Sequence, residues 1–214
     1  MTSHPAPRAP RAPSKRELIL AAATHAFATQ PYDEVNVNEI ARSADVAHGL
    51  VFYYFGDKRG LYIEVISNLL VELDRFVAAQ PHERSGEQII RGALARYLEF
   101  IAKYPVTMLA LLRTGLHEPD LRAVYSDARE VGLALILSGL NLDCDTAAPR
   151  LRMALRGWMG YTDAMAADWL ANDQDLPIDE CVDLSFDALV SALHSAEGHS
   201  PEPRGTALHF AAAP

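Results

Sequence analysis

The stretch NVNEIARSADVAHGLVFYYFGDK, from Asn36 to Lys58, decides the fold, because its spacing is typical of two short helices joined by a tight turn. Asn36 and Glu39 form a capping-box pattern, which predicts that a helix begins near Val37. Asp45 stands where the turn requires a positive φ, a conformation that Asp adopts more readily than most residues. A second helix is expected over about residues 47–54. Its predicted outward face consists of Ala47, His48, Gly49, Leu50 and Tyr53.

Residues 46–58, VAHGLVFYYFGDK, resemble the recognition-helix signature of TetR-family regulators, in which an aromatic run ends in Phe and a Lys follows three residues later. The resemblance is strongest over about residues 15–70 and implies a helix-turn-helix that reads operator DNA. Four positions depart from the family pattern. Asp45 replaces the usual turn Gly, Leu50 replaces a small hydroxyl residue, Phe52 replaces a common Tyr, and Tyr54 replaces a common His. A plain helical hairpin is the alternative interpretation.

The expected DNA contacts lie on and around this motif. His48, Leu50 and Tyr53 are expected to face base edges, and Gly49 would allow close approach of the backbone. Lys58 falls in the first turn of the next helix, where the helix dipole disfavours a cation, so we expect it to meet a DNA phosphate; a solvated lysine is the alternative. The full predicted set is Lys15, Asn36, Arg42, Ala47, His48, Gly49, Leu50, Tyr53, Tyr54 and Lys58.

Composition and length indicate a globular chain. It has 214 residues, half of them apolar, which suits one or two domains. No apolar run approaches the ~18 residues that a membrane span needs, and residues 131–140 are interrupted by Gly132, Ser138 and Gly139. The N-terminal segment has no apolar region of the secretory type, so a cytoplasmic protein without a membrane partner is expected.

The charge is distributed unevenly along the chain. The net charge is −9, yet residues 1–60 hold 7 Lys and Arg against 6 Asp and Glu, while residues 61–214 hold 12 against 22. Because affinity for nucleic acid depends on local basic groups, this asymmetry fits a small DNA-contacting head on an acidic body.

The pattern of apolar residues predicts an all-α protein of about nine helices. The chain is expected to have four segments, two of them folded. Residues 1–13 are expected to be a disordered basic arm, in which Arg8 and Arg11 either reach a minor groove or belong to an inert tail. Residues 14–60 form the predicted helix-turn-helix domain, and Ser14 is placed to cap its first helix. Residues 61–196 form the predicted effector-binding and dimerisation domain, and residues 197–214 a disordered tail.

Enzyme and metal motifs are absent from the sequence. There is no GxSxG elbow, HExxH, phosphate loop or GxGxxG motif, so an all-helical enzyme is only a distant alternative and no cofactor is expected. His117, Glu118 and Asp120 fit a surface turn better than a metal site. Cys144 and Cys181 stand far apart without a basic neighbour, which leaves thiol sensing as an alternative to two idle thiols.

The resemblance further implies a cavity for a small effector between about residues 85 and 172. Aromatic and flexible apolar residues are the expected lining, with three polar side chains among them, although ordinary core is the alternative for each. The predicted lining is Tyr97, Phe100, Met108, Leu112, Arg113, His117, Tyr125, Trp158, Tyr161 and Met165, with Asp163 as a further polar contact. An apolar or aromatic effector is expected, and a carboxylate only if Arg113 points inward.

The last two predicted helices, over residues 149–172 and 178–195, are expected to pair with those of a second subunit. The residues chosen for that interface are Gly157, Gly160, Ala164, Phe186, Leu189 and Leu193. The expected function is a homodimeric repressor that an effector releases from its operator. A regulator that senses thiols or works without an effector is the alternative.

Overall fold

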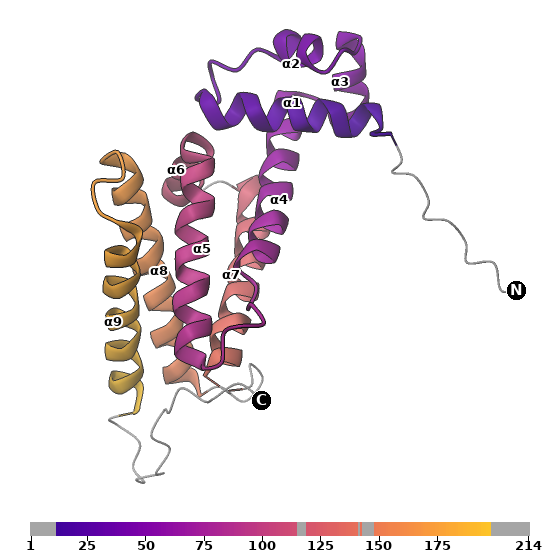
Figure 1. The fold of residues 1–214 in the computed structure, drawn as a ribbon. Coiled ribbons are helices and arrows are strands. Elements are labelled where there is room, and N and C mark those ends of the chain that lie inside the picture. Colours follow the sequence, from indigo (N-terminus) through magenta and orange to yellow (C-terminus); the bar gives the residue numbers. More distant parts are fainter. Residues whose placement is uncertain (1–11, 115–118, 141, 143–147, 198–214) are drawn as a thin grey trace, which may run out of the picture. The chain divides into compact units, whose positions relative to one another are not determined.

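The computed structural model describes residues 12–114, 119–140, 142 and 148–197 (Figure 1). These ranges hold nine helices and no strand, so the predicted all-α fold is confirmed. The helices are α1 (Lys15–Thr29), α2 (Val37–Ser43), α3 (His48–Phe55), α4 (Lys58–Val77), α5 (Gly86–Lys103), α6 (Pro105–Thr114), α7 (Pro119–Gly139), α8 (Pro149–Ala171) and α9 (Ile178–Glu197).

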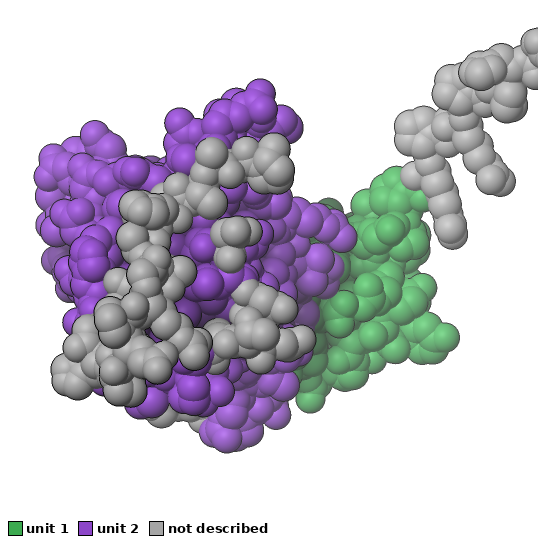
Figure 2. Space-filling model, turned by 90° about the horizontal axis from the view of Figure 1, so that it is seen from below, with its two compact units in different colours: residues 1–65 green, residues 66–214 purple. Residues whose placement is uncertain are grey.

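The chain divides into two compact units, residues 1–65 and residues 66–214 (Figure 2). The division falls within α4, so this helix begins in the first unit and continues into the second. No helix in the part of the chain that the structure describes is long and apolar enough to cross a membrane.

The first unit is built on α1, whose N-terminus has a complete capping box. The Ser14 hydroxyl accepts a hydrogen bond from the Glu17 amide at 3.3 Å, and the Glu17 carboxylate accepts one from the Ser14 amide at 2.6 Å, which confirms Ser14 as the cap. One helix face carries Ile19, Ala23 and Phe27 at the i, i+4, i+8 spacing, and all three are buried. Against this face pack α2 and α3.

The turn between α2 and α3 has the predicted backbone. Asp45 has φ of 52°, and the Val46 amide closes the turn by donating to the Ala41 carbonyl at 3.0 Å. The predicted capping box at α2 is wrong in one respect. Asn36 does cap the helix, but its side chain accepts from the Asn38 amide at 2.9 Å, and the Glu39 carboxylate makes no return bond to the Asn36 amide. Because the Asn36 side chain reaches the amide two residues further on, it caps this short helix without Glu39.

In the second unit, α9 packs against α5 and α8, while α7 packs against α5 and α6 packs against α8 (Figure 1). Buried polar bonds fix α8 to α9. The Trp158 indole donates to the Ser185 carbonyl at 2.7 Å, and the Thr162 and Ser185 hydroxyls are 2.8 Å apart. Because these groups are buried, the bonds are needed to offset their lost hydration and they fix the register of the two helices.

A buried ion pair joins the end of α4 to α5. The Arg96 guanidinium donates to Glu83 at 2.7 Å and to the Val77 carbonyl at 3.2 Å, while Glu83 also accepts from the Gln80 amide at 2.6 Å. Burial raises the pKa of Glu83, but the bonds to Arg96 and Gln80 outweigh burial and the net shift of that pKa is downward. The pair leaves no room for a side chain at Gly92, where an added Cβ would lie 1.8 Å from Glu83 Oε1.

Candidate nucleic-acid interface and ligand cavity

Helix α3 exposes a row of aromatic side chains. Val51 is only 1% exposed and anchors the helix, whereas Tyr53 is 79% exposed on the opposite side. Phe52 and Tyr54 are also exposed, and the His48 ring makes an edge contact with Phe52 at 4.8 Å between centroids. Of the predicted DNA-facing residues on this helix, Leu50 alone is half-buried, and the exposed ones are His48, Gly49, Tyr53 and Tyr54.

Four of the predicted contacts surround one shallow polar depression at the end of α2 and the start of α3. These four are Asn36, Arg42, Ala47 and His48. Within the described residues the Arg42 guanidinium, which is exposed, has neither a hydrogen bond nor an ion pair. It is therefore free to bind an anion from outside the chain.

The two predicted lysines have partners within the first unit. The Lys15 ammonium donates to the Asp45 carbonyl at 3.3 Å. The Lys58 ammonium donates to the Asp33 carbonyl at 3.3 Å and lies 4.7 Å from the centroid of the Tyr32 ring. Both bonds join cations to neutral acceptors, so neither lysine is neutralised by an acidic partner in these contacts.

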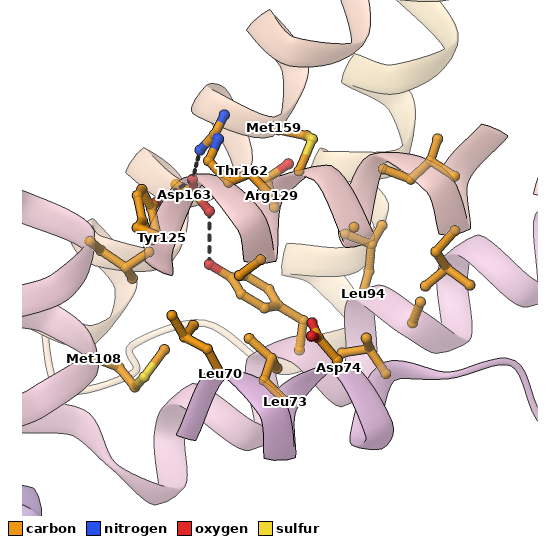
Figure 3. Close-up of a pocket in the computed structure, with 18 of the residues that line it drawn as sticks. Leu70, Leu73, Asp74, Leu94, Met108, Tyr125, Arg129, Met159, Thr162 and Asp163 are labelled. Atoms are coloured by element: carbon orange, nitrogen blue, oxygen red, sulfur yellow. Dashed lines mark hydrogen bonds and ion pairs between the residues drawn. The ribbon is translucent and has the colours of Figure 1, made fainter. Parts of the chain in front are cut away.

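The second unit contains a cavity of about 140 Å³ between α4, α5, α6, α7 and α8 (Figure 3). Six of the side chains that the sequence suggested line it: Tyr97, Met108, Leu112, Tyr125, Trp158 and Asp163. The remaining lining is mostly aliphatic and includes Leu70, Leu73, Leu94, Leu111 and Ile136. The site is therefore an apolar chamber with a few polar groups, as small-molecule sites usually are.

Four of the suggested lining residues lie elsewhere. Phe100 is buried against Phe76 and Tyr104, with ring centroids 5.8 and 5.3 Å away. Tyr161 and Arg113 are exposed, and Met165 is half-buried outside the lining. His117 lies outside the described residues. The four described side chains share helices with lining residues, and three of them stand one or two turns from a lining position, so periodicity and composition alone do not separate them from the lining.

Sequence reasoning missed the contribution of α4. Leu70, Leu73, Asp74 and Val77 all line the cavity, at the i, i+3, i+4, i+7 spacing of one helix face. The sequence shows this spacing. Because the helix was expected only to connect the DNA-binding domain to the effector-binding domain, its residues were not assigned to the ligand site. The other side chains that were missed include Arg129, Met159 and Thr162.

A polar network occupies part of the lining. The Asp163 carboxylate accepts hydrogen bonds from the Tyr97 hydroxyl at 3.0 Å and the Tyr125 hydroxyl at 2.7 Å, and it forms an ion pair with Arg129. Arg129 also donates to the Arg156 carbonyl at 3.3 Å. Burial raises the pKa of Asp163, and Arg129 and the two hydroxyls oppose that rise. Burial together with the Asp163 charge raises the pKa of both tyrosines, so their hydroxyls stay protonated donors.

A second carboxylate, that of Asp74, lines the same cavity and has no such partners (Figure 3). Within the residues that the structure describes, it makes no hydrogen bond or ion pair. Burial raises the pKa of Asp74.

The predicted interface residues separate into two groups. Gly157, Gly160 and Ala164 are exposed along α8. The other three, Phe186, Leu189 and Leu193, are buried within their own chain at 5%, 0% and 3% exposure, because α9 turns them toward α5 and α8. Large apolar side chains do lie on the exposed faces of these helices, namely Met153, Tyr161 and Leu184.

Thiol and metal chemistry find little support in the described part of the chain. Cys181 is 1% exposed, and burial together with nearby acidic residues raises the pKa of its thiol, which disfavours the reactive thiolate. Cys144 lies outside the described residues. No group of three or more His, Cys, Asp or Glu residues within the described ranges could hold a metal ion.

Comparison with solved structures supports the fold. A tetR-family transcriptional regulator from Streptomyces coelicolor superposes with a TM-score of 0.78 at 23% identity, covering 87% of this chain and 83% of that one. A regulator FadR from Bacillus subtilis, solved in complex with stearoyl-CoA, superposes with a TM-score of 0.60 at 19% identity, covering 83% of this chain and 98% of that one.

Sequence relatives are transcriptional regulators. An HTH-type transcriptional repressor of Mycobacterium tuberculosis is 35% identical over 118 residues, which are 51% of this chain and 61% of the relative. The chain thus spans less than two thirds of that protein's length. The HTH-type transcriptional repressor NicS of Pseudomonas putida is 29% identical over 140 residues, which are 62% of this chain and 66% of NicS.

Two family profiles match consecutive parts of the chain. The profile of bacterial regulatory proteins of the tetR family matches residues 19–65, which contain most of α1, α2, α3 and the start of α4. The profile of the tetracyclin repressor-like C-terminal domain matches residues 86–192, which contain α5 to α8 and most of α9. Since these matches cover more than half of the sequence in the expected order, the chain belongs to the TetR family of bacterial regulatory proteins.

Proposed function

We propose that this protein is a transcriptional repressor that binds operator DNA as a homodimer and releases it when a small molecule occupies the cavity of the second unit. It acts without catalysis and without a cofactor, in the cytoplasm. The observation that carries the proposal is the course of α4, which begins at Lys58 beside the recognition helix and lines the cavity with Leu70, Leu73, Asp74 and Val77. A ligand in the cavity and DNA at the head therefore act on the same helix.

The DNA surface is assigned to the exposed face of α3 and the polar depression beside it. His48 and Tyr53 are exposed for contact with base edges, and Arg42 is free for a phosphate. Lys15 and Lys58 make only neutral bonds within the head, so each could exchange its carbonyl partner for a phosphate. Phosphate contacts position the protein, whereas base contacts give it sequence preference.

The test uses an operator selected by the full-length protein from random duplexes. Arg42→Ala should weaken binding to all duplexes alike. It should also reduce the slope of log affinity against log salt concentration by about 0.9 per lost phosphate contact. His48→Ala should change the order of binding affinities among related operators. Arg84→Ala, at an exposed position of the second unit, serves as the control for a lost surface cation. Gel-shift titrations in which Arg42→Ala and His48→Ala both match wild type would refute the assigned surface.

The dimer interface is assigned to the exposed faces of α8 and α9. Small residues at Gly157, Gly160 and Ala164 would allow close helix approach, and Met153, Tyr161 and Leu184 supply exposed apolar area beside them. Tyr161→Asp should yield monomers that keep their helical content and lose operator affinity. Sedimentation that finds wild-type protein monomeric at micromolar concentration would refute this interface.

The effector is expected to be a small molecule with an apolar or aromatic body. Filling the cavity tests its role, because Leu73→Trp would place an indole among the lining residues, whereas Val71→Trp adds the same group at an exposed position of the same helix. Compounds that stabilise wild type in a thermal-shift screen and release operator should lose both effects in Leu73→Trp and keep them in Val71→Trp. Retention of both effects in Leu73→Trp would place the effector elsewhere.

A further inference from the structure

The described residues that line the cavity include ionisable groups of both signs, and among these charged side chains only one lacks a partner. Arg129 is engaged by the Asp163 carboxylate and the Arg156 carbonyl, so its positive charge is already matched. Asp163 in turn is matched by Arg129 and two hydroxyls. The Asp74 carboxylate has no hydrogen bond or ion pair among the described residues (Figure 3).

Asp74 occupies a position where folding alone would favour an apolar residue. Its neighbours on the same face of α4, Leu70, Leu73 and Val77, all line the apolar chamber. The Asp74 side chain is half-buried. Removing part of a carboxylate from water without a partner opposes folding, and residues that break a local rule in this way are expected at functional sites. The missing partner is supplied most simply by something that enters the cavity.

The rest of the lining also favours a positive guest over a negative one. The aromatic side chains Tyr97, Tyr125 and Trp158 line the chamber, and the face of an aromatic ring attracts cations. An anion would meet the Asp74 charge and would have to displace Asp163 from Arg129. The exposed Arg113 does not line the cavity, which removes the cation that a carboxylate ligand would have required.

Volume limits the size of the guest. The cavity of about 140 Å³ is close to the roughly 150 Å³ of an engineered apolar cavity that holds benzene. A body of one ring or of a short alkyl chain therefore fits without rearrangement of the lining.

We propose that the effector is a compact amine whose ammonium group pairs with Asp74 and whose apolar body, about the size of one ring, fills the chamber. The inference rests on the proposed function, since it names the class of molecule that would release the operator. An ion pair at Asp74 fastens the ligand to α4, the helix that continues into the DNA-binding unit.

Matched sets of amine, alcohol and carboxylate provide the test, for example benzylamine, benzyl alcohol and benzoate, with the corresponding cyclohexyl and butyl sets. Binding to the full-length protein is measured by calorimetry at constant pH and ionic strength. We expect the best amine to bind wild type at least about ten-fold more tightly than its alcohol, the effect of a hydrogen bond to a charged group. In Asp74→Asn this preference should fall below about two-fold while the alcohol still binds. Asp127→Asn, an exposed α7 position outside the lining, should keep the wild-type preference.

The outcomes separate the two proposals. An alcohol or carboxylate that binds wild type as tightly as its amine and releases operator would overturn the charge inference and leave the proposed function intact. An amine preference that persists in Asp74→Asn would also overturn it. If no member of any set binds the cavity while the protein still binds operator, a ring-sized amine is not the effector and DNA binding stands. Loss of operator binding by unliganded wild type would refute the proposed function itself.

Discussion

Asp163→Ala should be among the most destabilising substitutions in the second unit. The change removes the partner of Arg129 and the acceptor of the Tyr97 and Tyr125 hydroxyls together. Breaking a buried ion pair costs about 3–5 kcal/mol, and each hydroxyl left unsatisfied adds about 1–3 kcal/mol. The Arg129 and Asp163 side chains are 20% and 21% exposed, so water in the cavity offsets part of these losses. The lower ends of these ranges add up to about 5 kcal/mol, and with the offset from water we expect a loss of about 3–4 kcal/mol in the free energy of unfolding.

Urea unfolding at fixed protein concentration measures this loss, because both tryptophans, Trp158 and Trp169, lie in the second unit and report on it. Combining Asp163→Leu with Arg129→Met removes both charges, so the double variant should lose at least about 2 kcal/mol less than the sum of the single variants. A loss below about 1 kcal/mol for Asp163→Ala, or additive single losses, would show that the network contributes little.

Three further substitutions test separate features. Gly92→Ala would place a Cβ 1.8 Å from Glu83 Oε1 and 2.9 Å from Arg96 Nη1. A urea titration should show a loss of about 2–3 kcal/mol in the free energy of unfolding, whereas a loss below about 0.5 kcal/mol would show that the Glu83 and Arg96 side chains move aside at little cost. Gly56→Ala forces a φ of 79° on a residue with a Cβ and should lower the stability of the head by about 1–2 kcal/mol, which circular dichroism during heating would reveal. Burial raises the pKa of Asp74 in the folded state above the unfolded value of 3.8, so the ionised carboxylate destabilises the fold. This loss of stability is complete above the folded pKa and absent below the unfolded pKa. Asp74→Asn should therefore unfold at higher urea than wild type at pH 7, with the advantage disappearing as the pH falls below 3.8, and equal midpoints at pH 7 would contradict this.

The sequence predicted the head well because its signals are local. A positive φ at Asp45, a capping hydroxyl at Ser14 and a buried Val51 each follow from residue type and near neighbours. The same locality explains the error at α2, where Asn38 and Glu39 both offered a partner for Asn36. Side-chain reach selects between such partners, and a spacing rule does not encode it.

The body was predicted less well because its site depends on which helix faces meet. The residues Phe186, Leu189 and Leu193 look as suitable for a subunit interface as for a core, and only the packing of α9 against α5 and α8 shows that they are buried within the chain. Tyr97 and Phe100 lie one turn apart on α5, yet only Tyr97 reaches the cavity. These distinctions require the arrangement of helices far apart in sequence, which periodicity does not provide.

In the proposed function, coupling between ligand and DNA needs little movement if α4 behaves as a rigid rod. Lys58 and Leu70 are separated along this helix by about 18 Å at a rise of ~1.5 Å per residue. A tilt of about 5° at the cavity would then displace the first turn by about 1.5 Å, enough to disturb hydrogen bonds to phosphates or base edges that tolerate only a few tenths of an ångström. An allosteric effect of the usual size, about 1–3 kcal/mol, requires only that the ligand bind the tilted conformation that much better. An ammonium group that pairs with Asp74 in one orientation of α4 and not in the other would supply a difference of this size.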